Sequence, residues 1–137
     1  MKKYKFLLVF LLVLSISCTR KNKIEDIFIT SENYYWQFNS ECQGAFGHSI
    51  NFKFDKDGLS HQYGFSVEKS YHSVEGESLA PKKWFIKNDS ILSWDDMDYK
   101  IEHIDATIII LSRYHPIDKK QKCKISFLKV VDGKLIN

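Results

Sequence analysis

The chain has 137 residues, of which 44% are hydrophobic, and it carries 20 Lys and Arg against 17 Asp and Glu. Lys2, Lys3 and Lys5 belong to the first segment, so the rest of the chain is formally neutral. A neutral domain has no overall field that attracts it to nucleic acid or to an anionic membrane surface, and about 120 residues after that segment allow one domain but exclude two.

The chain begins with MKKYKFLLVFLLVLSISC, which has the layout of a secretory signal peptide. A basic start precedes an apolar run from Phe6 to Ile16, and the small residue Ser17 stands directly before Cys18. The apolar run is about eleven residues long, whereas a helix that crosses ~30 Å of hydrocarbon needs ~20. We therefore expect residues 1–17 to be a lipoprotein-type signal peptide that is removed, rather than a membrane-spanning helix.

The tetrad Ser15-Ile16-Ser17-Cys18 resembles the lipobox of bacterial lipoproteins. The resemblance implies cleavage before Cys18 and lipid attachment to it, and two or three acyl chains make attachment to a membrane lasting. Residues 18–30 would then be the lipidated cysteine and a polar tether. The implied location is the bacterial cell envelope, and Thr19 after the cysteine favours the outer membrane. An ordinary signal peptide, or an uncleaved anchor with Cys18 as an incidental thiol, remains the alternative.

Beyond the tether, apolar and polar residues alternate or form short apolar runs between turn residues, which is typical of strands. Eight strands are predicted, at residues 34–39, 49–54, 59–67, 83–87, 90–94, 98–104, 107–113 and 122–131. Asp55-Lys56-Asp57-Gly58, Asn88-Asp89 and Asp105-Ala106 fall where tight turns would join neighbours. We expect residues 31–137 to form an all-β antiparallel meander, closed into a small barrel or sandwich.

Two other segments have no strand pattern of their own. Residues 24–30 could form a single helical turn that closes one end of the domain. Residues 70–81, SYHSVEGESLAP, have no clear period and are expected to be the longest connection after the tether.

The alternation also predicts the core, because aromatic and branched side chains suit a pleated, half-buried surface. The expected core residues are Trp36, Phe38, Ile50, Phe52, Phe54, Trp84, Ile86, Ile91, Ile101, Ile104, Ile108, Ile110, Ile125, Phe127 and Leu128. The aromatic side chains either fill the interior or line a pocket. The candidates for lining a pocket are Trp36, Phe52, Phe65, Trp84 and Trp94, with simple core packing as the alternative.

Two cysteines remain besides Cys18, and a chain that folds outside the reducing cytosol can form a disulfide. Cys42 and Cys123 are the candidate pair, which would close a loop of about eighty residues and stabilise the fold by ~4 kcal/mol. Two buried thiols are the alternative.

Motifs that carry chemistry are missing or incomplete in this sequence. Asp55-Lys56-Asp57-Gly58 resembles the start of a calcium loop, but Ser66 stands where the bidentate Glu should be. Asp95, Asp96 and Asp98 could supply oxygens to a cation, although a solvated hairpin tip explains them as well. The histidines have no metal-ligand spacing. We therefore expect no metal, no cofactor and no enzymatic activity.

Taken together, several motifs resemble those of small lipocalin-like lipoproteins of bacteria. They are Cys18, the first-strand Trp36, the hairpin FDKDG of residues 54–58 and WFIKND of residues 84–89. The resemblance implies an envelope protein with a non-catalytic binding role, either for a small apolar ligand in the barrel or for an envelope protein on its surface. The rival hypothesis is an inhibitor or immunity-type lipoprotein that binds a protein through the acidic residues 95–98 or the basic residues 113–124.

Overall fold

The computed structural model describes residues 23–31, 33–42, 50–76 and 79–136, so the signal segment, Cys18 and the start of the tether lie outside the described residues. Within these ranges the chain forms one helix and ten strands. They are α2 (Lys23–Phe28), β1 (Tyr35–Ser40), β2 (Ile50–Phe54), β3 (Leu59–Ser66), β4 (Ser70–Ser73), β5 (Lys82–Asn88), β6 (Ile91–Trp94), β7 (Met97–Ile104), β8 (Ile108–Tyr114), β9 (Lys122–Val131) and β10 (Lys134–Leu135). The described helix is too short to cross a membrane.

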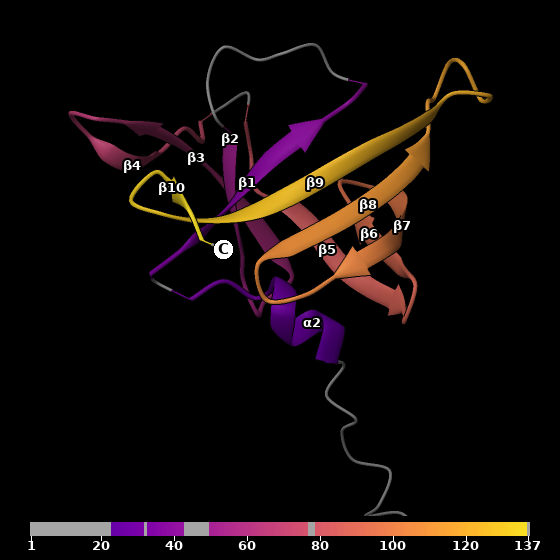
Figure 1. The fold of residues 1–137 in the computed structure, drawn as a ribbon, viewed down its shortest axis with the longest axis horizontal. Coiled ribbons are helices and arrows are strands. Elements are labelled where there is room, and N and C mark those ends of the chain that lie inside the picture. The colour runs from indigo at the N-terminus through magenta and orange to yellow at the C-terminus, as the bar shows by residue number, and fades with distance from the viewer. Residues whose placement is uncertain (1–22, 32, 43–49, 77–78, 137) are drawn as a thin grey trace, which may run out of the picture.

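The strands form one antiparallel sheet that closes on itself (Figure 1). Hydrogen-bonded neighbours follow the order β1-β2-β3-β5-β6-β7-β8-β9, and β9 pairs back with β1 from Tyr35↔Val130 to Ser40↔Ile125. The predicted antiparallel meander is therefore confirmed, and its eight strands make a barrel-like ring. Each of them lies within one residue of its predicted bounds.

The prediction that residues 70–81 are a plain connection is wrong, because they contain β4. This strand pairs with the second half of β3, from Tyr63↔Ser73 to Ser66↔Ser70. In the described residues β3 pairs with β5 at Leu59↔Lys83 and Ser60↔Lys82, and its second half leaves the ring and pairs with β4. The sequence prediction also missed β10, which follows a two-residue turn after β9.

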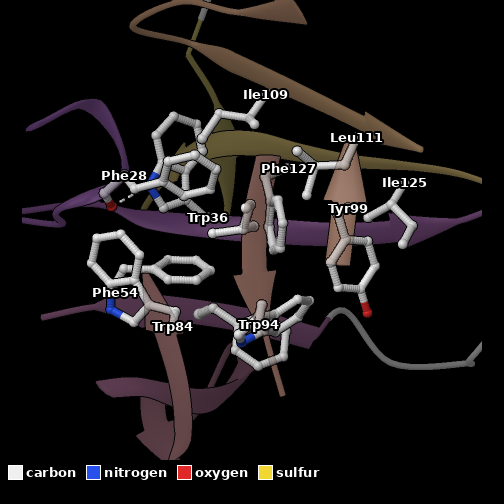
Figure 2. Packing of buried hydrophobic residues seen from close by; sticks show 12 residues of the cluster. Phe28, Trp36, Phe54, Trp84, Trp94, Tyr99, Ile109, Leu111, Ile125 and Phe127 are labelled. Carbon is white, nitrogen blue, oxygen red and sulfur yellow. Dashed lines mark hydrogen bonds between the residues drawn. The ribbon is translucent and has the colours of Figure 1, made fainter. Parts of the chain in front are cut away.

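The helix α2 covers one end of the ring (Figure 1). Its last residue, Phe28, is fully buried, with its ring 5.5 Å from Phe54 and 5.8 Å from Trp84. The carbonyl of Phe28 accepts a hydrogen bond from the indole N–H of Trp36 at 3.2 Å (Figure 2). The helical turn predicted at residues 24–30 is confirmed at Lys23–Phe28, inside the range 18–30 that the sequence assigned to the lipidated cysteine and tether. Ile24, Ile27 and Phe28 have the spacing of one apolar helix face, and they pack on the core.

The inside of the ring is filled mainly by aromatic and branched side chains (Figure 2). On β8 the inward residues are Ile109 and Leu111, whereas Ile108 and Ile110, predicted as core, are only partly buried. The cross-strand pairs Ile109↔Phe127 and Leu111↔Ile125 explain the difference, because pairing with β9 turns these residues inward. The same correction applies on β6, where Leu92 rather than Ile91 is fully buried.

Cys42 and Cys123 are joined by a disulfide, with their Cα atoms 5.5 Å apart. The N–H of Glu41 donates to the carbonyl of Lys124 at 3.0 Å, which continues the β1–β9 pairing up to the two cysteines. The bond therefore lies at the seam where the last long strand closes the ring onto the first.

Candidate ligand-binding site

A cavity of about 310 Å³ lies at the end of the ring opposite α2. The helix covers the end where β2 finishes at Phe54, whereas Ile50, where β2 begins, lines the cavity. The cavity is partly enclosed, and its volume is at the lower end of the ~300–1,000 Å³ found for small-molecule sites. Its lining consists of Phe38, Ser40, Ile50, Phe52, Gln62, Leu79, Lys82, Trp94, Asp95, Met97, Tyr99, Arg113 and Ile125.

Three aromatic side chains form the inner wall of this cavity. The ring of Trp94 lies 5.1 Å from that of Phe52 and 6.0 Å from that of Phe38, in edge-to-face contacts. The indole N–H of Trp94 donates to the hydroxyl of Ser60 at 2.8 Å, and that hydroxyl donates to the carbonyl of Lys82 at 3.2 Å. Because the polar atom of Trp94 has a partner within the protein, the ring offers apolar surface to the cavity.

The structure brings two of the five predicted pocket residues together, since Phe52 and Trp94 line the cavity. Trp36 and Trp84 are buried at the opposite end, in contact with Phe28 of α2. Phe65 lies on the part of β3 that pairs with β4, with its ring 4.8 Å from Tyr71.

The sequence prediction missed the other residues of the lining. It placed Phe38 and Ile50 in the core and assigned no inward role to Tyr99 or Arg113. Tyr99 and Arg113 continue the inward alternation of β7 and β8, so a period-two pattern with the correct face could have found them. On β8 the sequence prediction chose the wrong face, since it placed Ile108 and Ile110 inward instead of Ile109 and Leu111.

The charged residues of the cavity are unevenly matched. Lys82 and Asp95 form an ion pair at 3.2 Å, so these two charges compensate each other. Arg113 has no such partner, because no carboxylate of the described residues lies within 4.0 Å of its guanidinium. The cavity therefore holds one positive charge that the described part of the chain does not balance.

The hydrogen bonds of the Arg113 guanidinium are also incomplete. Its Nη1 atom donates to the sulfur of Met97 at 3.0 Å, and its Cζ atom lies 5.6 Å from the centre of the Tyr99 ring. Its Nε atom is buried and has no hydrogen-bond partner among the described residues. A thioether is a weak acceptor, and a buried donor without a partner costs about 1–3 kcal/mol. The Nε atom is closed to the cavity as well as to solvent, so an acceptor in the cavity would bind the guanidinium through its Nη atoms.

Tyr99 does not supply the missing negative charge. Burial raises the pKa of its hydroxyl above the usual value, and this effect outweighs the nearby Arg113, which lowers it. The hydroxyl therefore stays neutral at physiological pH.

A second depression, of about 510 Å³, lies over outward positions of β7, β8 and β9. Its lining includes Asp98, Lys100 and Lys122, and Met97 and Arg113 border both this depression and the cavity. Apart from Arg113, its charges are paired within the protein: Lys87 contacts Asp98 at 2.6 Å, and Glu102 accepts from Lys122 at 2.7 Å and from Lys100 at 3.1 Å.

The acidic residues 95–98 form the tip of the β6–β7 hairpin. Asp95 and Asp96 both have positive φ, at 51° and 59°, which is the backbone of a two-residue hairpin turn. Asp95 pairs with Lys82 and Asp98 with Lys87. Within the described ranges, no group of three His, Cys, Asp or Glu side chains is placed to hold a metal ion.

No family model, curated protein or solved structure shows significant similarity to this chain.

Proposed function

We propose that this chain is an envelope lipoprotein that binds a small apolar molecule in the cavity at the open end of the ring, without catalysing a reaction. The observation that carries the proposal is the wall formed by Phe38, Phe52 and Trp94, which borders a partly enclosed space of about 310 Å³. Binding is favoured by about 25 cal/mol for each Å² of apolar surface that a ligand removes from water in such a space. The lipocalin-like motifs of the sequence agree with this role.

The proposed lipid anchor supports the same role. A chain held at a bilayer through Cys18 would meet apolar molecules at high local concentration. Mass spectrometry of the protein from the membrane fraction tests the anchor, and we expect loss of residues 1–17 and a lipid adduct on Cys18. An unmodified Cys18 in that fraction would rule the anchor out.

Native mass spectrometry of the purified full chain tests ligand binding. We expect the protein to retain or acquire a small lipid, and the variant Ile50→Trp to lose it because the larger ring fills the cavity. Val67→Trp is the matched control, since Val67 is 97% exposed in the turn between β3 and β4 and should bind as the wild type does. Failure of the wild-type chain to carry any lipid would contradict the proposal.

A protein-binding or inhibitor role is the second candidate, and the outer depression favours it. Tyr114 and Ile117 are 65% and 89% exposed at the β8–β9 end of this surface. Substitution of both by Ser should abolish capture of a single envelope protein if this role is correct, whereas Ile50→Trp should not affect that capture. The internal pairing of Asp95 and Asp98 leaves less charge for such a partner than the sequence suggested.

A further inference from the structure

The unbalanced guanidinium of Arg113 restricts the kind of ligand that the cavity can hold. Arg113 lines the cavity beside Met97 and Tyr99, and no carboxylate of the described residues lies within 4.0 Å of its guanidinium. An apolar molecule bound over the guanidinium would remove water from it without offering a hydrogen-bond acceptor or an opposite charge. A ligand with an anionic acceptor at the Nη atoms would balance the charge.

We propose that the occupant is a small amphiphile with a carboxylate head and an apolar tail, its carboxylate bound by Arg113 and its tail on Phe38, Phe52 and Trp94. This inference rests on the proposed function, because it names the ligand class of the same cavity. The planar fork of a guanidinium matches the two oxygens of a carboxylate, and such charge-assisted pairs are stronger than neutral hydrogen bonds.

The charge of the site favours a carboxylate over a phosphate. Lys82 is already paired with Asp95, so Arg113 offers a single unmatched positive charge. A carboxylate carries one negative charge, whereas a phosphate monoester carries about −1.5 to −2 near pH 7. A phosphate would leave negative charge unmatched beside Asp95.

The arrangement also orients the ligand. Arg113 is near the end of β8, at the level where β1 ends and β2 begins, and it borders the outer depression as well as the cavity. Trp94 lies further inside, with its ring 5.4 Å from that of Phe127 in the core. The head therefore lies at the mouth of the ring and the tail points inward.

The test compares three probes of equal chain length: octanoate, 1-octanol and octyl phosphate. Each is titrated onto the full chain held in lipid nanodiscs, with empty nanodiscs subtracted. We expect octanoate to bind about ten-fold or more tightly than either of the others, as charge-assisted pairing predicts. Tighter binding of octyl phosphate, or equal binding of octanoate and octanol, would overturn the carboxylate assignment.

Variants of Arg113 test whether this residue binds the carboxylate. Arg113→Met should weaken octanoate binding about ten-fold or more and leave octanol binding within about two-fold, which also shows that the cavity is intact. Arg113→Lys should bind octanoate with an affinity between those of the wild type and Arg113→Met, because it keeps the charge but not the planar fork. Lys124→Met, which removes an exposed charge on β9, is the control and should change nothing.

The outcomes separate the two proposals. If octanol and octanoate bind alike and Arg113→Met changes neither, the apolar site stands and the carboxylate inference fails. If no probe binds the wild-type chain, both proposals fail.

Discussion

At the scale of single residues, the carboxylate of Glu102 accepts hydrogen bonds from three different side chains. It lies at the bulge of β7 between Ile101 and His103, where the register with β8 shifts. Its carboxylate accepts hydrogen bonds from Lys122 at 2.7 Å, Ser112 at 2.6 Å and Lys100 at 3.1 Å. A bulge redirects a side chain, and here it aims a carboxylate across β8 towards β9.

These contacts predict how stability changes with acid. The hydrogen bond from Lys122, followed by those from Ser112 and Lys100, lowers the pKa of Glu102 from 4.5 to about 2. A lowered pKa gives stability that is present above the unfolded value and is lost as the pH falls towards 2. Glu102→Gln should therefore be less stable than wild type at pH 7 and lose less stability between pH 5 and pH 2. Urea unfolding at pH 7, pH 5 and pH 2 measures the free energy of unfolding. Equal losses of stability in the two proteins between pH 5 and pH 2 would contradict the prediction.

At the scale of elements, the short β9–β10 hairpin is held against the β3–β4 hairpin. Asp132 and Gly133 both have positive φ, at 49° and 73°, and the N–H of Gly133 donates to the hydroxyl of Tyr71 at 3.0 Å. A Cβ atom at Gly133 would lie 2.5 Å from the ring of Phe65. Gly133 is thus required both by its turn and by its neighbour.

Gly133→Ala should therefore destabilise the protein by about 2–4 kcal/mol, from the left-handed backbone and the clash together. Gly58→Ala separates the two causes. Gly58 has φ of 83°, but its added Cβ would make only a 3.4 Å contact, so about 1–2 kcal/mol is expected from the backbone alone. Denaturant midpoints measure both changes, and equal losses would show that Phe65 yields without cost.

At the scale of the whole molecule, the disulfide joins Cys42, just after the first strand β1, to Cys123 in β9, the last strand of the ring, across 81 positions of sequence. A bridge across a loop of this length is worth about 4 kcal/mol through the entropy of the unfolded chain. Reduction should lower the free energy of unfolding by about that amount. Cys42→Ala, which has no bridge to lose, should be insensitive to reductant.

The pairing itself is checked by titrating thiols in denaturant without reductant. The bonded structure predicts that neither Cys42 nor Cys123 reacts. Two reactive thiols would mean that the cysteines are buried but free, and the expected effect of reductant would vanish with them.

The sequence alone determined the eight strands of the ring, because period-two alternation and turn residues act locally and need no knowledge of partners. It did not determine which face of β8 is inward. Ile108, Ile109, Ile110 and Leu111 are all apolar, so both alternations look alike until β9 pairs and selects Ile109 and Leu111. It also missed β4, whose pairing depends on β3 leaving the ring.

The position of the candidate site was decided by tertiary structure for the same reason. The alternation marks Phe52, Trp36 and Trp84 as inward residues, but their distance from α2 determines whether they line the cavity or the closed end. The sequence likewise showed an arginine in a strand without showing its surroundings. Pairing of β7 with β8 places Arg113 over Tyr99, and closure of the ring brings both to the same cavity as Phe38 and Ile50. Local patterns specify elements, whereas a site forms where elements distant in sequence meet.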